Sequence, residues 1–314
     1  MGKNKYNNDE YKDLIVEFFG DLFYSSVSYG TKIQKIRQYT EIILRRLLEY
    51  TCDNNLEIGN EYTLKKLDKK GFKEPLLRDS LEKIRLTGNE RTHTRFRRVA
   101  TEGEYQEVLE SLFNLYAYLF FKYFEKYGFG ANSDILTSFS LLPPIIRHIA
   151  LEALYENDNT NVSVIDKLVL AKIKALGKEN ALLWVENNKE HLMNLKYKVD
   201  EKYENDLIEI LGLAMAKIVL QQSPNNMYEI CSEKIDKVGS LIDRSGPRYK
   251  DFETAKFFYE NHGKVNGNTN EIIEFNDLME FIYIGRRVKE VDIKKIPEDQ
   301  LLLDKVVWVY NKQE

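Results

Sequence analysis

Residues 81–95, LEKIRLTGNERTHTR, place chemically active side chains where an ordinary amphipathic helix would carry alanine or leucine. Arg85, Asn89 and His93 recur at every fourth position, so on an α-helix they lie within an arc of about 80°. A neutral histidine can take a proton from a ribose 2′-hydroxyl or return one to a leaving oxygen. Arginine can stabilise charge on a crowded phosphate, and asparagine can orient either group. The triplet therefore predicts metal-independent RNA cleavage, with His93 as general acid/base, Asn89 as orienting group and Arg85 as phosphate stabiliser.

Gly88 stands inside the same helix, where glycine costs about 1 kcal/mol relative to alanine. That cost indicates the close approach of another backbone, a side chain or a ligand. The surrounding residues 78–98 hold seven Arg or Lys and three Asp or Glu, a local excess of +4 in a chain whose net charge is −4. Arg95, Arg97 and Arg98 in this run are predicted to bind nucleic acid. A solvated helix face and a structural histidine are the alternative interpretations.

Only six prolines interrupt long patterns of helical period, which predict a mainly α protein. The polar, small-residue stretch GFGANSDI is the predicted linker between two domains, residues 1–130 and 131–314. β-favouring residues in 263–288 and in LLLDKVVWVYNK predict a small β element near the C-terminus. The predicted helices cover residues 11–27, 30–53, 61–72, a segment from Pro75 through the motif, 101–128, 144–156, 162–176, 178–196, 201–221 and 227–242.

Three segments in order, IRQYTEIILRRLL (36–48), TLKKLDKKG (63–71) and LEKIRLTGNERTH (81–93), resemble the HEPN superfamily. The most similar branch is the domain-of-unknown-function family 4145, and the resemblance covers about residues 10–128. It implies a bundle of four or five helices and a homodimer that brings two motif helices together across a twofold axis. It also implies RNA cleavage in microbial defence or toxin systems, with Arg37 and Glu41 of the first segment bracing the site.

One position departs from the family pattern. Active HEPN ribonucleases carry arginine, a polar residue, three variable residues and histidine, whereas here Gly88 stands where the arginine would be. Asn89 and His93 match, and Arg85, one turn earlier, is the expected replacement. Two functions remain open: an endoribonuclease effector of an anti-phage or toxin–antitoxin-like system, and a non-catalytic module that binds nucleic acid or assembles a defence or restriction complex. The expected partners are RNA, or alternatively DNA, and a protein of a defence system.

Several other classes of function lack their usual residues. Cys52 and Cys231 stand far apart without a histidine cluster, which predicts neither disulfides nor a metal site. The chain has no phosphate-binding, dinucleotide-binding, nucleophile-elbow or zinc-protease motif, so no cofactor is expected. Its polar start lacks a signal peptide, and charges interrupt the most apolar segment, 108–128. We therefore expect a cytoplasmic protein without a membrane span.

Overall fold

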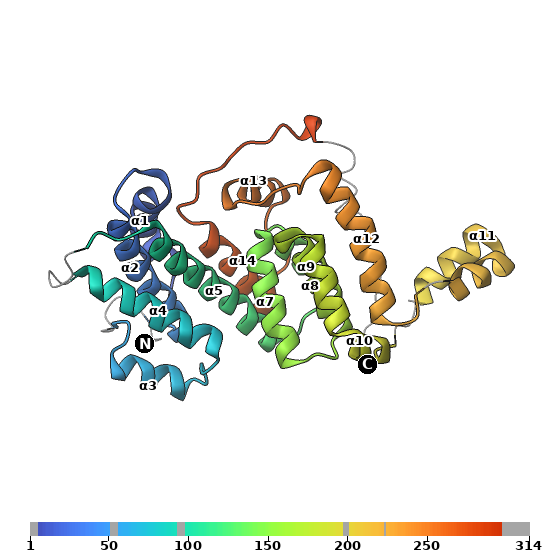
Figure 1. The fold of residues 1–314 in the computed structure, drawn as a ribbon, viewed down its shortest axis with the longest axis horizontal. Coiled ribbons are helices and arrows are strands. Elements are labelled where there is room, and N and C mark those ends of the chain that lie inside the picture. The colour runs from blue at the N-terminus through green and yellow to red at the C-terminus, as the bar shows by residue number, and fades with distance from the viewer. Residues whose placement is uncertain (1–5, 51–55, 93–97, 197–200, 223, 297–314) are drawn as a thin grey trace. The chain divides into compact units, whose positions relative to one another are not determined.

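A computed structural model describes residues 6–50, 56–92, 98–196, 201–222 and 224–296, and within them the chain forms helices and no β-strand (Figure 1). This result confirms the predicted mainly α fold. Two short 3₁₀ helices, Asn8–Tyr11 and Ile293–Lys295, flank the α-helices. These are α1 (Lys12–Tyr24), α2 (Tyr29–Leu48), α3 (Glu61–Lys69), α4 (Pro75–Thr92), α5 (Glu102–Tyr127), α6 (Ser133–Phe139), α7 (Pro144–Asn157), α8 (Val162–Leu176), α9 (Lys178–Asn187), α10 (Lys189–Asn194), α11 (Glu201–Gln222), α12 (Met227–Ser245), α13 (Phe252–His262) and α14 (Asn270–Tyr283).

The helix ends follow local capping chemistry. The Ser28 hydroxyl accepts the Thr31 N–H at the start of α2, and Pro75 is the first residue of α4. Proline fits that position because the first N–H of a helix has no intrahelical acceptor. The predicted helix 178–196 is two helices, α9 and α10, which are separated at Asn188, whose side-chain amide donates to the Trp184 carbonyl at 2.8 Å.

The segment 263–288, whose composition favours a strand, instead contains helix α14. The Thr269 side chain caps the helix by accepting the N–H of Ile272. Buried apolar residues recur with helical spacing along it, at positions 272, 275, 279 and 282. This period outweighs the strand propensity of the individual residues. The other predicted β segment, 301–312, lies outside the described residues.

The chain divides into two compact units. The first contains residues up to Tyr123 together with Tyr259–Lys289, and the second contains Phe124–Phe258 and the residues that follow Lys289. The chain crosses between the units inside α5 and inside α13. Residues 259–289 thus belong to the first unit although they follow the predicted boundary at residue 130. That 1–130 and 131–314 behave as independent domains stays a prediction.

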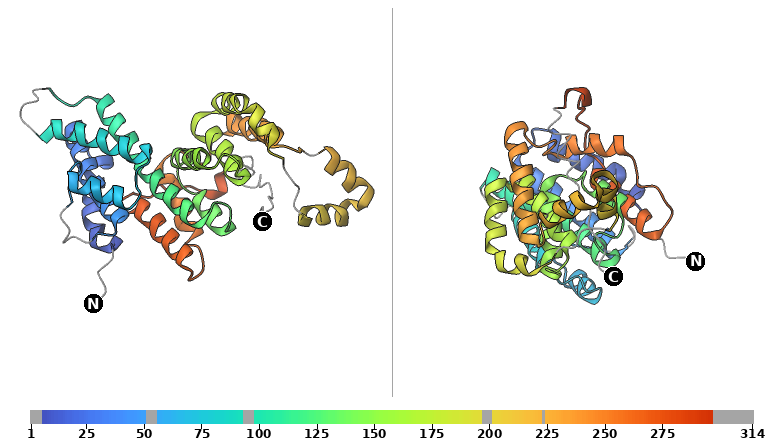
Figure 2. Two further views of the ribbon diagram at one scale, coloured as in Figure 1. Left: turned by 90° about the horizontal axis from the view of Figure 1, so that it is seen from below. Right: turned by 90° about the vertical axis from the view of Figure 1, so that its right-hand side faces the viewer.

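The first unit is built around a cluster of buried aromatic rings. Tyr39 of α2 lies at its centre, with its ring centroid 4.9 Å from Phe19 of α1, 6.0 Å from Tyr116 of α5 and 5.9 Å from Phe281 of α14. Figures 1 and 2 show α14 beside α5, where Phe275 meets the rings of α5. Helix α14 is therefore part of the core of this unit.

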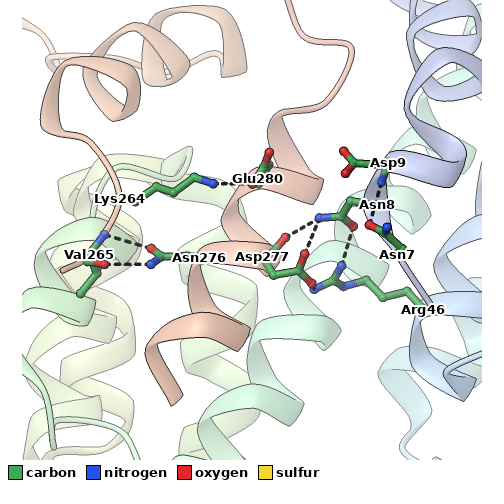
Figure 3. A network of polar contacts seen from close by, with 9 residues as sticks. All are labelled: Asn7, Asn8, Asp9, Arg46, Lys264, Val265, Asn276, Asp277 and Glu280. Atoms are coloured by element: carbon green, nitrogen blue, oxygen red, sulfur yellow. Dashed lines mark hydrogen bonds and ion pairs between the residues drawn. The ribbon is translucent and has the colours of Figure 1, made fainter. Parts of the chain in front are cut away.

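Polar contacts hold α14 in the first unit from two sides (Figure 3). On one side, the Arg46 guanidinium donates to the Asn8 side-chain oxygen at 2.7 Å and pairs with the Asp277 carboxylate at 2.6 Å. The Asn8 amide in turn donates to the carbonyl and the carboxylate of Asp277. On the other side, the Asn276 side chain exchanges two hydrogen bonds with the backbone of Val265.

The second unit has an aliphatic core formed by α8, α9, α10 and α12, with residues such as Val169, Val185 and Ile235 fully buried. A buried ion pair, Asp166 of α8 with Lys234 of α12, lies beside this core with both side chains at most 1% exposed. Gly212 (φ 74°, ψ 157°) is non-helical and divides α11 into two parts. In the described part of the chain, none of the helices combines the length and apolar character that crossing a bilayer requires.

Candidate nucleic-acid interface between helices α2 and α4

The predicted site helix, α4, buries one stripe of its surface in the first unit. Leu77, Leu81, Ile84 and Gly88 are buried and recur at spacings of three or four residues. Gly88 therefore continues the stripe that packs inside the unit, and its helix contacts α2. Arg85 and Asn89 are half-buried at the edge of the stripe, consistent with their positions one residue further round the helix.

Helix α2 presents a matching polar row. Arg37, Glu41 and Arg45 recur at every fourth residue and are half-buried. We call the surface that these three residues form with Arg85, Gly88 and Asn89 of α4 the α2–α4 seam; that list defines the name throughout.

Gly88 is the point of closest approach within the seam. A Cβ atom on Gly88 would lie 3.3 Å from Cβ of Arg37 and only 2.6 Å from its Cδ, and the second distance is closer than real carbon atoms pack. The stem of Arg37 therefore lies directly on the glycine. This contact agrees with the expectation that glycine at this position admits a close neighbour, and the neighbour is a side chain of α2.

The Glu41 carboxylate is held between two arginines and a backbone donor. Burial raises its pKa above the ordinary value of 4.5, while the charges of Arg37 and Arg45 and a hydrogen bond from the Ile58 N–H lower it. Because burial is the largest of these effects, the carboxylate is partly desolvated in the seam. The hydrogen bond from Ile58 links α2 to the segment that precedes α3, and the bracing role of Glu41 in the site stays a prediction.

The same segment contacts α4 through Arg85. Gly59 has a φ of 83°, in the left-handed region that favours glycine, and a Cβ there would overlap the stem of Arg85. The Arg85 guanidinium donates to both carboxylate oxygens of Glu82, at 2.8 and 2.6 Å. The stem of Arg85 therefore packs against Gly59, and its guanidinium is held by Glu82. The sequence analysis assigned neither partner. Residues three apart are neighbours on a helix surface, so the Glu82–Arg85 pair could have been predicted from the sequence.

The basic run around the motif is largely neutralised where its side chains are described. Besides Arg85, three of its cations pair with carboxylates outside the run: Arg78 with Asp68 at 2.6 Å, Lys83 with Glu107, and Arg98 with Glu104 at 2.7 Å. Arg98 is nevertheless exposed. The local excess of positive charge in the sequence therefore does not produce a row of unpaired cations along this part of α4.

Glu104 also caps the first turn of helix α5. Its carboxylate accepts the N–H of Thr101, whose hydroxyl accepts the N–H of Glu104, in a reciprocal capping box. Arg98, one of the predicted nucleic-acid-binding residues, is thus anchored at a helix N-terminus. His93, Arg95 and Arg97 lie outside the described residues, as does the side chain of Arg91. The structure thus places Arg37 against Gly88 and near Glu41, while Arg85 and Asn89 lie half-buried on the same helix as Gly88. The position of the histidine stays a prediction.

This arrangement can present guanidinium groups to an anion at the surface of a helix pair. Arginine suits that task because its planar donors match the geometry of a phosphate. Among the described residues, no three His, Cys, Asp or Glu side chains come together in a way that could hold a metal ion. Comparison of the sequence with protein-family models finds no match, and comparisons with curated proteins and with solved structures find none either.

Proposed function

We propose that the protein is a cytoplasmic, metal-independent endoribonuclease of the HEPN type, acting in a microbial defence or toxin system as a homodimer. The observation that supports this proposal best is the packing of Arg37 on Gly88. It adds an arginine of α2 to the half-buried Asn89 of α4, which precedes His93 by four residues in the sequence. A cation, an amide and a histidine on one face are the groups that cleavage by a 2′-hydroxyl requires.

The proposed reaction needs no external reactant. His93 accepts the proton of the ribose 2′-hydroxyl, and the 2′-oxygen forms a bond to the adjacent phosphorus. The bond from phosphorus to the 5′-oxygen of the next nucleotide breaks, and that oxygen receives a proton, either from the protonated histidine or from the second protomer's histidine. The products are a 2′,3′-cyclic phosphate and a 5′-hydroxyl. An arginine beside the phosphate stabilises the charge on its oxygens while five groups surround the phosphorus.

The test is cleavage of a mixed pool of tRNA and other RNA in EDTA. Wild type is compared with His93→Ala and with His262→Ala, a change at an exposed histidine outside the seam. The proposal expects products with 2′,3′-cyclic phosphate ends from wild type and His262→Ala, and a loss of at least about a hundredfold in rate for His93→Ala. Equal cleavage by wild type and His93→Ala would contradict the proposed role of His93.

A second candidate function is a non-catalytic module that binds nucleic acid or a protein partner. The pairing of Arg85 with Glu82 favours the binding module. A guanidinium that already donates two hydrogen bonds to a carboxylate has fewer donors for a phosphate. The same experiment separates the two functions. An intact RNA pool that is nevertheless retained by the protein in a filter-binding assay would support the module and contradict the nuclease.

A further inference from the structure

Among the described helices, α11 of the second unit exposes the largest group of apolar side chains. Five large apolar residues within nine consecutive positions are between 43% and 78% exposed: Ile210, Leu211, Leu213, Met215 and Ile218. Single exposed apolar residues are common on protein surfaces and need no explanation. A contiguous group, in contrast, marks a surface that another molecule covers.

The second half of α11 is apolar on nearly every side. Residues 213–220 hold one charged residue, Lys217. Ala216 is fully buried, so one side of this half is already covered. Met215 and Ile218, which lie about 100° and 160° from Ala216 round the helix, are exposed. A helix that is hydrophobic all round normally lies inside a core, so the exposed sides also need a cover.

The charges of α11 are divided unevenly about Gly212, where the helix bends (Figures 1 and 2). The first half, residues 201–211, holds four carboxylates and one lysine, whereas the second half holds Lys217 alone. Glu209 and Lys217 are both exposed, three and five positions from the bend. If two copies of α11 pair about a twofold axis near Gly212, the first half of each lies on the second half of the other. Glu209 of each copy then faces Lys217 of the other copy, so the surface is complementary to itself.

A lipid surface suits the same residues less well. Each half of α11 is about 15 Å long, whereas the hydrocarbon core of a bilayer is about 30 Å thick. Helices that lie in the membrane interface carry lysine and arginine on their polar face. Helix α11 carries four carboxylates and two lysines, which an anionic lipid surface would repel. A second copy of the chain, in contrast, offers Lys217 to the carboxylates.

Two such surfaces supply the area that a specific interface needs. A prominent apolar patch on a monomer covers roughly 300–600 Å², and two of them with a polar rim amount to roughly 1,000–2,000 Å². We propose that α11 is a self-association surface, on which two copies of the chain pair their exposed apolar faces about a twofold axis and form a four-helix arrangement. The inference does not rest on the proposed function, whose dimer joins the motif helices of the first unit.

Sedimentation velocity of the full-length chain at increasing concentrations tests the proposal. The variant Ile210→Asp places a charge in the apolar face, and Leu183→Asp places the same charge on an exposed leucine of α9 as the matched control. Circular dichroism establishes that both variants are folded. We expect Ile210→Asp to weaken self-association at least about a hundredfold, because each dimer contains the substitution twice, and Leu183→Asp to change it less than about twofold. A wild type that stays monomeric would overturn the inference, as would an Ile210→Asp variant that associates like wild type.

A charge exchange gives a second, independent readout. We expect Lys217→Glu and Glu209→Lys each to weaken self-association by about three- to tenfold, because two like-charge contacts form in each dimer. In an equimolar mixture of the two variants, one copy carries carboxylates at both positions and the other carries lysines. The mixed dimer should therefore associate about as strongly as wild type, which sedimentation with one variant fluorescently labelled measures. A mixture no stronger than either variant alone would contradict the twofold pairing, because a contact within one chain does not respond to mixing.

Other occupants of α11 give distinguishable results, each of which would overturn the inference. A monomeric wild type that Ile210→Asp destabilises to heat would place the apolar face on another surface of the same chain. A monomeric wild type that sediments with vesicles of phosphatidylcholine and phosphatidylserine, and loses this binding in Ile210→Asp, would assign the face to a lipid surface. Self-association that Ile210→Asp abolishes while RNA cleavage is unchanged would support this inference and separate it from the site on α4.

Discussion

The guanidinium of Arg46 and the carboxylate of Asp277 form an ion pair of 2.6 Å although 231 positions separate them in the chain. The pair joins α2 to α14, and Arg46 also lies over the ring of Phe281 on the same helix, 4.9 Å from its centroid. Charge pairing and aromatic stacking therefore act on the same two elements. The last α-helix of the described chain is therefore fixed to the helix that carries Arg37.

Replacing Asp277 with alanine should lower the free energy of unfolding by about 1–3 kcal/mol, because it removes the acceptor of Arg46, whose side chain is only 11% exposed. Urea unfolding followed by circular dichroism measures the change. Glu280→Ala is the matched control on α14, since Glu280 pairs with an exposed Lys264 and should contribute below about 1 kcal/mol. Equal effects of the two substitutions would contradict the importance of the Arg46 pair.

The buried pair of Lys234 and Asp166 should be costly to break from one side. Burial lowers the pKa of Lys234 well below its ordinary value. Lys234 is also the closest cation to the buried Asp166 carboxylate. We expect Lys234→Met to destabilise the second unit by about 3–5 kcal/mol, because it removes the nearer of two lysine partners of Asp166, which is 0% exposed, and leaves only Lys167 at 3.4 Å. The double variant Lys234→Met, Asp166→Leu should regain much of that loss in differential scanning calorimetry. A double variant less stable than Lys234→Met alone would argue against this account.

His148 should make stability depend on pH. Burial and the charge of Lys172 lower its pKa from 6.5 to about 4, so the folded protein keeps it neutral where the unfolded chain is protonated. The unfolded state therefore binds more protons between about pH 6.5 and pH 4, and the unfolding free energy should fall as the pH falls through that window. His148→Gln should reduce the slope by at most about 1.4 kcal/mol per pH unit, measured by urea unfolding at several pH values.

Glu41 should act in the opposite direction. Its pKa is raised from 4.5, chiefly by burial, so the folded state holds a proton to higher pH than the unfolded state. Its contribution to stability is then complete below pH 4.5 and is lost as the pH rises through the folded-state pKa. Glu41→Gln keeps an acceptor for the Ile58 N–H and removes the titrating group. We expect the decline in unfolding free energy above pH 4.5 to become shallower in this variant, and an unchanged profile would contradict the assignment.

Most of the helices could be predicted because their apolar residues recur with helical period over ten residues or more. Helix α8 runs over residues 162–176, as the pattern predicts. Helix α14 was missed because isoleucine, phenylalanine and tyrosine favour strands as individual residues, although their spacing is helical. In this segment the strand propensity of the single residues disagreed with the helical spacing of the apolar side chains. Burial of those side chains against α5 favoured the helix.

In the site, the close approach at Gly88 could be predicted but its partner could not. A glycine inside a helix indicates a near neighbour, whereas the identity of that neighbour depends on the register between α2 and α4, which tertiary packing sets. The pairing of Arg85 with Glu82 could be predicted from their spacing of three residues, and the phosphate-stabilising role of Arg85 stays a prediction.

The first unit is assembled from two stretches of chain, with the whole of Phe124–Phe258 between them. A ribosome must therefore synthesise Phe124–Phe258, the larger part of the second unit, before it delivers the helix that covers Tyr39 and Phe120. At ordinary rates of synthesis, the interval between Tyr123 and Tyr283 is roughly 10–30 s. During that time the nascent first unit exposes the aromatic rings that α14 later buries. We expect it to depend on chaperones until its last helix emerges, and to acquire its full stability only then.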